Sequence, residues 1–468
     1  MKSLDAEHDS TRGNNTPSEE VSTYLPDEDI REILDAARSQ DSDTVYAALE
    51  ELSPADAAEL ISKIKEEDRQ ELLSMYGEAL DPQIFSELDQ ELSRSALETM
   101  PTASVVDIIS QLESDDALLL VETLSPDIQQ EVINRLSTKD RLALKEGLSF
   151  PEDSAGRLMR RELVAIPEFW TVGKTIDYLR TSTKSLPDDF FDLFIINPSH
   201  HLTGSIPLCL LVRSDREEKI SNLQIEGTNA IPAEMDQEEV AHMFRRDNIV
   251  SAPVIDNDGR LIGMITIDDI IDVIDEEAQE DLLRMAGVDH GDLYRAVIAT
   301  ANTRFKWLFV NLLTAILASI VISFFGATIE QIVALAVLMP IVASMGGNAG
   351  TQALTVAVRA IATHEISETN TLRVIWKETL VGLLNGVLFA VITGFLAALW
   401  FQLPILGIVI ALAMIINLIV AGLFGAGIPL FLHRIGSDPA VSSTVLLTTI
   451  TDVIGFLSFL GLAALMMV

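Results

Sequence analysis

Long apolar stretches separated by short polar joints occupy the C-terminal part of the chain. Five of them are long enough to cross a bilayer, which takes about 20 residues of helix. Five such runs in succession favour membrane-spanning helices over a buried soluble core. The stretches are 305–325, 331–358, 379–401, 405–432 and 440–467.

Positively charged residues flank these stretches on one side only. They precede the first stretch and occur again between the second and third and between the fourth and fifth, whereas the other two connections contain no Lys or Arg. Because Lys and Arg concentrate in cytoplasmic loops, this side is predicted to face the cytoplasm. We therefore expect a multi-pass protein of the cytoplasmic (inner) membrane, surrounded by lipid, with its N-terminus inside and its C-terminus outside.

Residues 28–150 carry the pattern of short amphipathic helices. Ser53-Pro54 and Ser125-Pro126 each place a hydroxyl side chain before proline, which is typical of a helix N-cap and first turn. The spacing of apolar residues predicts helix pairs stacked as a solenoid. Residues 1–27 are polar and lack the apolar run of a signal peptide, so they predict a disordered acidic tail.

Residues 154–275 alternate between strand and helix patterns in two halves, about 154–220 and 221–275. The second half resembles a CBS domain, a small α/β module that usually comes in pairs, and Gly263, Thr266 and Asp269 match its G-x-x-T-x-x-D pattern. The resemblance implies a fold of paired α/β modules in which this hydroxyl and this carboxylate could hold ATP.

The first half departs from that pattern. Pro207 and Leu210 stand where the threonine and the aspartate are expected. A purely structural CBS pair is therefore an equal alternative to one that binds a nucleotide.

Charge divides the chain unevenly. From Arg295 onward there are seven Lys/Arg and six Asp/Glu, whereas the whole chain has a net charge of −38, so the first 294 residues carry −39. Such a surface repels phosphates, which argues against nucleic acid as a partner, and it suits either solubility or the collection of cations. The single Cys209 excludes a disulfide framework, and no nucleophile–base pair suggests an enzyme.

Asp452, near the middle of the last apolar stretch, is the most informative residue of the membrane half. A carboxylate at membrane depth is costly unless it faces a partner, a water-filled path or a cation. In the second stretch, Pro340 precedes Gly346-Gly347-Asn348. These small residues either pack between helices or expose backbone to a cavity, and Asn348 favours a pore wall.

Acidic side chains also cluster just before the first apolar stretch. Glu277, Glu280 and Asp281 have the i, i+3 and i+4 spacing of one helix face, where like charges repel unless a positive group lies between them. Carboxylates without His or Cys suit hard cations such as Mg²⁺ or Ca²⁺. A solvated acidic face is the alternative.

These parts, in this order, resemble the MgtE family of magnesium channels and transporters. The most specific matches are Pro340 with Gly346-Gly347-Asn348, Thr451-Asp452 before Gly455, and Glu277 with Glu280-Asp281. The resemblance covers about residues 28–468. It implies a multidomain membrane protein with an all-α N-domain (28–150), a CBS pair (154–275), a connecting or plug helix (276–302) and five transmembrane helices (303–468).

The resemblance also implies a homodimer with an ion pore along its axis. Asp452 of each protomer would bind hydrated Mg²⁺, and Asp438 would lie near the cytoplasmic mouth, although Asp438-Pro439 is equally a helix N-cap pair. Regulatory Mg²⁺ would bind acidic positions of the cytoplasmic domains, two of which are replaced here by Gln83 and Asn248. The positions carried over are Asp115, Asp236, Glu238, Asp269, Asp272, Glu277, Glu280 and Asp281.

The chain is thus predicted to be a Mg²⁺-selective channel or transporter that imports magnesium and is closed by intracellular Mg²⁺. One alternative is a secondary exchanger of divalent cations (Mg²⁺, Co²⁺, Mn²⁺) for protons, against which the lack of a second intramembrane carboxylate or His counts. Another is a nucleotide sensor whose membrane half is an anchor, but an anchor needs only one span.

Overall fold

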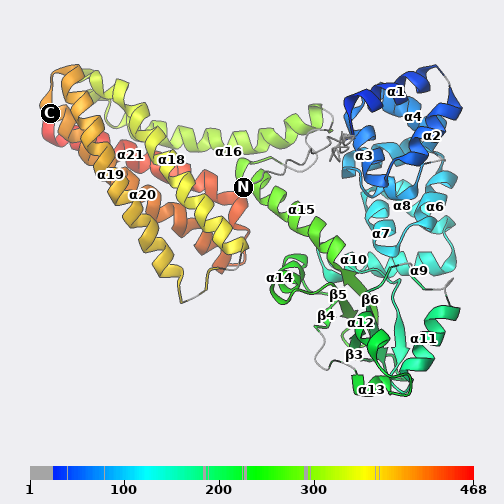
Figure 1. Cartoon of the computed structure of the whole chain (residues 1–468). Helices are drawn as coiled ribbons and strands as arrows, with labels where there is room; N and C mark the ends of the chain where they lie inside the picture. The colour runs from blue at the N-terminus through cyan, green and yellow to red at the C-terminus, as the bar shows by residue number, and fades with distance from the viewer. Residues whose placement is uncertain are drawn as a thin grey trace, which may run out of the picture. The chain divides into compact units, whose positions relative to one another are not determined.

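The computed structural model describes residues 25–467 except 40, 78–79, 183–185, 188, 224, 226–228, 289–293, 296, 364 and 368. The chain divides into two compact units, Met1–Ser149 and Phe150–Val468. Figure 1 shows helices only in the first unit, and two small sheets and several long helices in the second. Most of the tail predicted over 1–27 lies outside the described residues.

The first unit consists of short helices, most of them about ten residues long. Helix α5 packs on α7, α6 on α8, and α7 on α9, so successive helices stack as the solenoid prediction requires. The Ser53 hydroxyl accepts a hydrogen bond from the Asp56 amide at 3.2 Å and starts α3 at Pro54, as expected of an N-cap. The helices are α1 (Asp27–Arg38), α2 (Ser42–Glu51), α3 (Pro54–Lys63), α4 (Glu66–Tyr76), η2 (Pro82–Phe85), α5 (Gln90–Thr99), α6 (Thr102–Gln111), α7 (Ser114–Thr123), α8 (Pro126–Arg135) and α9 (Thr138–Gly147).

The second unit begins with two α/β modules of the same topology. Each has a three-stranded sheet in which the first two strands are parallel and the last two antiparallel, in the orders β1-β2-β3 and β4-β5-β6. This repetition agrees with the predicted CBS pair. The elements are α10 (Ala155–Leu158), β1 (Ala165–Pro167), α11 (Val172–Thr181), β2 (Asp192–Ile196), β3 (Leu202–Pro207), α12 (Leu208–Arg213), α13 (Ile220–Leu223), β4 (Ile231–Pro232), α14 (Gln237–Asp247), β5 (Ser251–Ile255) and β6 (Leu261–Thr266).

Helix α15 (Ile267–Ala286) has different bounds from the connecting helix expected over 276–302. The expected helix over 276–302 is not a separate element, because the helix that closes the second module continues without a break to Ala286. A capping box of Thr266 and Asp269 starts it, and Gly287 ends it in the left-handed conformation with φ +70°. Residues 289–293 and 296 lie outside the described part, and the next helix begins at Val297.

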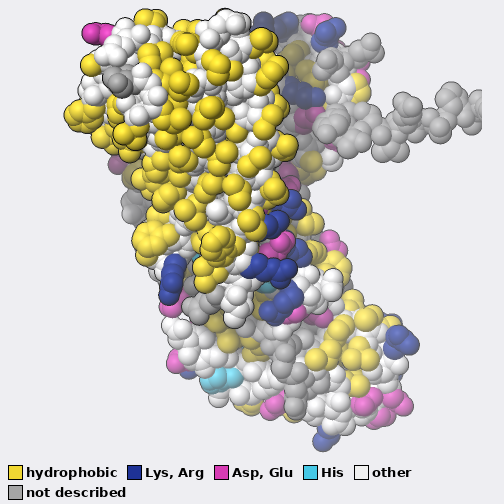
Figure 2. All heavy atoms as spheres, turned by 90° about the vertical axis from the view of Figure 1, so that its left-hand side faces the viewer, with side chains coloured by type: hydrophobic (Ala, Val, Ile, Leu, Met, Phe, Trp, Pro, Cys, Tyr) yellow, Lys and Arg dark blue, Asp and Glu magenta, His cyan; other side chains and the backbone are white. Residues whose placement is uncertain are grey.

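Five helices are long and apolar enough to cross a membrane, in agreement with the predicted stretches. Figure 2 shows one face of this region covered largely by hydrophobic side chains. Such a face suits lipid as its surroundings, and the chain is a multi-pass membrane protein. The helices are α16 (Val297–Ser323), α18 (Ala334–Ala362), α19 (Thr371–Phe401), α20 (Pro404–Arg434) and α21 (Pro439–Met467), with the short α17 (Gly326–Gln331) before α18.

Helix α20 is the centre of this bundle and packs against α18, α19 and α21. Small residues allow the close contacts: Gly382 and Gly386 of α19 lie against the α20 backbone, and Gly425 of α20 lies against Gly350 of α18. In a bilayer, where lipid tails are as apolar as leucine, such close packing is a main source of helix association.

Candidate functional site

Helix α18 has one buried face of small residues and one exposed face of polar residues. The helix continues through Pro340 without interruption, so the glycine run does not break it. Gly346 and Gly350 are buried, whereas a Cβ on Gly347 would meet nothing within 4 Å. Small residues therefore pack between helices on the buried face, and the exposed face stays the predicted pore wall. The exposed polar residues are Ser344, Asn348, Thr351, Gln352 and Thr355.

Some side chains of this exposed face form hydrogen bonds with backbone carbonyls of the same helix. The Thr351 hydroxyl donates to the Gly347 carbonyl at 3.0 Å, and the Thr355 hydroxyl donates to the Thr351 carbonyl at 2.9 Å. Their oxygens can still accept hydrogen bonds from water or from the hydration shell of an ion. A polar face of this kind is unfavourable against lipid, so it needs a water-filled path or another protein surface.

Helix α21 runs antiparallel to α18 and brings Asp452 to the same depth as this polar face. A Cβ on Gly350 of α18 would lie 3.0 Å from the side chain of Leu447 of α21. One turn earlier, Gly346 lies against the side chain of Asn417, which Gly455 of α21 also contacts. Asp452 lies between Leu447 and Gly455 in sequence, just as Asn348 lies between the two glycines of α18. Asp452 is half-buried.

Asp438 lies directly before α21 and is paired with α15. Arg284 Nη1 donates to Asp438 Oδ2 at 2.7 Å, and the same guanidinium forms an ion pair with Glu280. One helical turn into α21, the Thr444 hydroxyl donates to the Met285 carbonyl at 3.1 Å. The end of α15 is thus bonded to the start of α21, which sequence reasoning did not predict because Arg284 had no assigned role.

Carboxylates at the start of α14 and on α15 come together near this contact. Gln237 Nε2 donates to Glu277 Oε1 at 2.6 Å, and Glu238 lies beside Glu277, with Asp236 and Asp281 in electrostatic range. Partial burial and then the Glu277 carboxylate raise the pKa of Glu238 to about 7. Glu238 as a whole is still exposed, so the close carboxylate is the firmer cause.

Asp281 responds to the same crowding. Its burial, then Asp438 and Glu277, raise the pKa of Asp281, while Arg284 opposes the rise. A bound divalent cation would remove this repulsion by neutralising several carboxylates at once. We call Asp236, Glu238, Glu277 and Asp281 the carboxylate cluster.

The pH dependence of cation binding tests the carboxylate cluster. Since the pKa of Glu238 is raised from 4.5, the packed cluster is most stable below that value and loses stability as pH rises through 7 unless a cation binds. Protons compete less for these carboxylates at higher pH. The apparent Mg²⁺ affinity of the protein should therefore rise by about tenfold between pH 6 and pH 8. Thermal unfolding of the detergent-solubilised chain, titrated with Mg²⁺ at each pH, measures this.

Two variants serve as comparisons for the pH experiment. Glu238→Gln should abolish most of the pH dependence, whereas Glu239→Gln, an exposed position next in sequence, should preserve it. An equal pH dependence in the wild type and in Glu238→Gln would show that Glu238 is not the titrating group.

The other predicted regulatory residues are not members of the carboxylate cluster. Asp115 lies in the first turn of α7, in the N-terminal unit, and Asp272 is exposed on α15. Asp269 accepts a 2.8 Å hydrogen bond from Arg160. Among the residues that the structure describes, no group of three or more His, Cys, Asp or Glu is arranged to hold a metal ion directly. Binding through the ion's own water shell, which Mg²⁺ retains readily, is the arrangement that fits.

The residues predicted to hold a nucleotide have other contacts. Thr266 Oγ1 donates to Asp269 Oδ2 at 2.7 Å within the capping box of α15, and Asp269 also pairs with Arg160. A Cβ on Gly263 would lie 2.6 Å from Met159 Sδ, so this glycine permits close packing. These contacts give all three residues a structural role.

A groove of about 810 Å³ lies instead between the first module and the loop before β5 of the second. Phe190, Leu208, Val212 and Ile249 give it a largely apolar lining, and Pro207 stands where the CBS pattern has threonine. The groove therefore has room for a flat ring system but lacks the expected hydroxyl.

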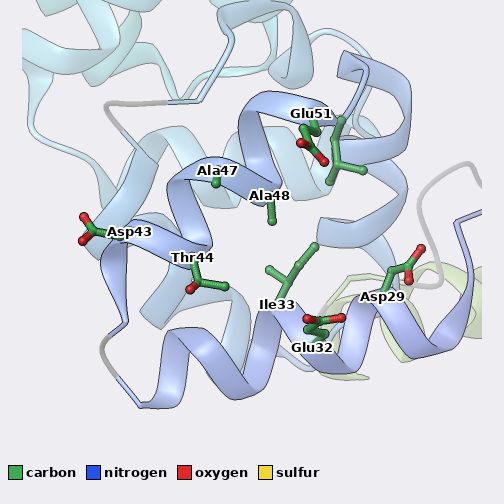
Figure 3. A pocket seen from close by; sticks show the side chains of 9 residues that line it. Asp29, Glu32, Ile33, Asp43, Thr44, Ala47, Ala48 and Glu51 are labelled. Atoms are coloured by element: carbon green, nitrogen blue, oxygen red, sulfur yellow. The ribbon is translucent and has the colours of Figure 1, made fainter.

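A second groove, of about 610 Å³, lies between α1 and α2 in the N-terminal unit. Ile33 and Ala48 lie at its centre, with the carboxylates of Asp29, Glu32 and Glu51 spread around it (Figure 3). These carboxylates are not among any arranged metal-binding group of the described residues. The groove therefore has an acidic rim around an apolar centre.

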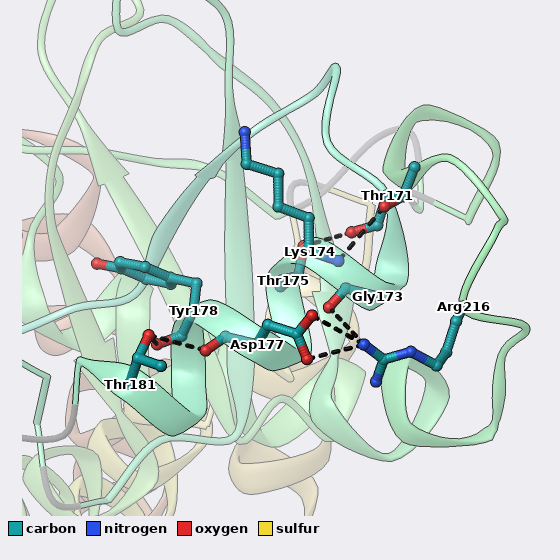
Figure 4. A network of polar contacts seen from close by, with 8 residues as sticks. All are labelled: Thr171, Gly173, Lys174, Thr175, Asp177, Tyr178, Thr181 and Arg216. Carbon is teal, nitrogen blue, oxygen red and sulfur yellow. Dashed lines mark hydrogen bonds and ion pairs between the residues drawn. The ribbon is translucent and has the colours of Figure 1, made fainter.

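The first α/β module is held by a polar network around α11 (Figure 4). Arg216 Nη2 donates to both oxygens of Asp177, at 2.7 and 2.9 Å, and the Thr171 hydroxyl accepts from the Lys174 amide at 3.3 Å. The network joins the loop before α13 to α11. Its role is structural, since every partner in it is another part of the same module.

Several buried polar residues of the membrane helices were missed by the sequence predictions, and Glu378 and Asn417 are two of them. Glu378 of α19 is buried and continues, at intervals of four, the small-residue face that includes Gly382 and Gly386. Asn417 is completely buried in α20. The sequence contains a clue to each of them. Glu378 precedes a G-x-x-x-G pattern, and Asn417 interrupts an apolar run.

Comparison with known proteins identifies the family. A family model described as a divalent cation transporter matches residues 339–462, the MgtE intracellular N domain matches 52–153, and the CBS domain matches 229–276. The chain is 34% identical over 318 residues to the magnesium transporter MgtE of Bacillus subtilis, covering 68% of this chain and 70% of the relative. It is 32% identical over 322 residues to that of Thermus thermophilus, covering 68% and 71%.

Two solved structures of the soluble or cytosolic part of a magnesium transporter match about half of the chain. The soluble part of a magnesium transporter matches at 26% identity with a TM-score of 0.47, covering 54% of this chain and 98% of the other. The cytosolic domain of the Mg²⁺ channel MgtE in complex with ATP matches at 26% identity with a TM-score of 0.49, covering 52% and 99%. With both TM-scores below 0.5, the sequence relationship decides: the chain belongs to the MgtE family of magnesium transporters.

Proposed function

We propose that the protein is a Mg²⁺-selective channel that imports magnesium across the cytoplasmic membrane and is closed by Mg²⁺ bound to its acidic cytoplasmic part. The observation that carries this is the position of Asp452. It lies half-buried at the depth of the polar face of α18, in a helix that has no other charged residue. The Mg²⁺ transporters among its relatives supply the ion's identity.

The selectivity step rests on hydration chemistry. Mg²⁺ gives up its water shell reluctantly, so a site that reads the intact shell uses carboxylate and amide or hydroxyl oxygens rather than a tight cage. Asp452 supplies the charge, and Asn348 with Thr351 supplies hydrogen-bonding groups at the same depth. Gly347 keeps the wall open because it has no side chain there.

A homodimer would complete this path. In a single chain the polar face of α18 is exposed, and lipid cannot satisfy its hydrogen bonds. Helix α15 also exposes apolar side chains outside the membrane, with Ile271 54% and Leu282 69% exposed. A second copy placed face to face would cover both surfaces and bring two Asp452 carboxylates to one axis.

Closure by Mg²⁺ would act through α15. Its end is bonded to α21 beside Asp438, and the carboxylate cluster opposes this packing when no cation is present. Mg²⁺ that binds the packed arrangement more tightly than the open one shifts the equilibrium towards closure. Acidic residues of the N-domain, Asp115 among them, would extend the same response. High internal Mg²⁺ would thereby limit its own uptake.

The second candidate is an exchanger of divalent cations for protons. Glu378 is the observation in its favour, because it is a buried carboxylate at the end of a membrane helix. It lies on the face of α19 that packs against α20, where the Gly422 backbone approaches its carbonyl, rather than on the polar face of α18. This position favours a packing role over proton relay.

Currents through the purified protein in planar bilayers test the channel proposal. The reversal potential should follow the Mg²⁺ gradient by about 30 mV per tenfold change, the value for a divalent ion. A proton gradient should leave it unchanged. Strict dependence of Mg²⁺ flux on a proton gradient would instead establish the exchanger.

ATP binding stays a prediction. The cytosolic domain of the channel MgtE has been solved with ATP. In this chain Thr266 and Asp269 are bonded to each other and to Arg160, and the groove of the first module is largely apolar. The proposed channel function does not depend on a nucleotide.

A further inference from the structure

Asn417 is a fully buried amide at the centre of α20, the most apolar of the five membrane helices. A polar side chain in such a place is tolerated when it bonds across to a neighbouring helix. Asn417 does so: its Nδ2 donates to the Val342 carbonyl of α18 at 2.9 Å. The bond therefore ties α20 to α18 just after Pro340.

The amide occupies space that two glycines leave free. A Cβ on Gly346 of α18 would overlap Asn417 Nδ2, and a Cβ on Gly455 of α21 would lie 2.8 Å from the same atom. Asn417 is thus clamped between α18 and α21, the two helices that carry Asn348 and Asp452. Gly346 is two residues before Asn348, and Gly455 is three residues after Asp452.

The other half of the amide has no structural explanation. Asn417 Oδ1 is buried and has no hydrogen-bond partner within the described part of the chain. A leucine would fill a similar volume without leaving an unsatisfied acceptor. The Nδ2 bond to Val342, and not packing alone, accounts for an amide at this position.

Pro340 makes that bond more consequential. Proline has no backbone N–H, so it cannot donate to the Ala336 carbonyl, and α18 is weakened at this turn. The Asn417 bond engages the helix one half-turn later, at Val342. It can therefore set the position of the turn that carries Gly347 and Asn348.

We propose that Asn417 is a positioning residue of the ion path: it holds the polar face of α18 and the Asp452 segment of α21 at one depth and spacing. The inference rests on the proposed function, in which these two groups read hydrated Mg²⁺. Loss of the bond lets the turn shift, so that the wider shell of Ca²⁺ is discriminated less well.

Asn417→Leu tests this, because leucine keeps the branching and removes the hydrogen bond. We expect the variant to fold and conduct, with the permeability ratio of Mg²⁺ to Ca²⁺ in planar bilayers reduced about tenfold or more. Thermal unfolding and gel filtration confirm the fold. A ratio equal to that of the wild type would overturn the inference, since packing would then suffice.

A second pair of variants tests the inference even if the Asn417→Leu variant does not fold. Gly346→Ala alone should disrupt the protein, because its Cβ would overlap Asn417. Asn417→Ala with Gly346→Ala relieves the overlap and refills the space, so folding should return while selectivity stays reduced. Wild-type selectivity in the double variant would also overturn the inference.

The outcome can be separated from failure of the proposed function. If Asp452→Asn abolishes Mg²⁺ current and Asn417→Leu retains wild-type selectivity, only the role of Asn417 is wrong. If the wild type carries no selective Mg²⁺ current, or if Asp452→Asn retains it, the proposed function itself fails.

Discussion

Replacing Asp452 with asparagine is expected to reduce Mg²⁺ uptake by on the order of 100-fold, because a dimeric pore would lose two carboxylates at membrane depth, each worth about tenfold. Asparagine keeps the shape of the side chain and removes only its charge. Uptake into magnesium-starved cells, and currents in planar bilayers, measure the effect. Asp452→Ala should be at least as severe.

The matched control is Glu330→Gln. Glu330 is exposed at the end of the short α17, so the substitution removes the same charge outside the membrane helices. Uptake by this variant should equal that of the wild type. Full activity of both Asp452 variants at normal expression would remove Asp452 from the ion path.

Replacing Glu277, Glu280 and Asp281 together with glutamine is expected to weaken inhibition by internal Mg²⁺. The concentration for half-inhibition should rise by roughly 5- to 150-fold, the usual range of coupling between two sites. Without these carboxylates, Mg²⁺ gains little by binding the packed arrangement of α14 and α15. Patch recordings with graded internal Mg²⁺ measure the shift.

A second triple variant controls for general charge effects. Glu239, Asp275 and Glu276 are exposed on the same two helices, and their replacement with glutamine removes the same number of charges. Inhibition should be nearly unchanged in it. Equal shifts in the two triple variants would mean that net acidity alone, and not the carboxylate cluster, sets the response.

Much of the fold follows from local patterns. The length of each apolar run predicted the five membrane helices, and Ser53-Pro54 predicted the start of α3, because both signals act within a few residues. The bounds expected for the connecting helix, 276–302, differ from those of α15, which begins at Ile267 and ends at Ala286. Thr266 and Asp269 were interpreted as a possible nucleotide site, and they form the capping box at the start of this helix.

The candidate site was only partly predictable. Asp452 and Asn348 stood out because polar groups are rare in apolar runs. Asn417 and Glu378 carried weaker signals of the same type, and their meaning depends on which helix face is buried. Arg284 could not be assigned from its position in α15, because its partner Asp438 is 154 residues away.

The sequence by itself determined the membrane spans, the paired α/β modules and the family, and it singled out Asp452 as a candidate, since periodicity, apolar length and local motifs are properties of short segments. Tertiary structure alone decided which face of α18 is open, how Asn417 fits between Gly346 and Gly455, and how the carboxylates around Glu238 and Asp281 raise the pKa values of these two groups. Those features are distances between segments far apart in the chain, and only packing sets them.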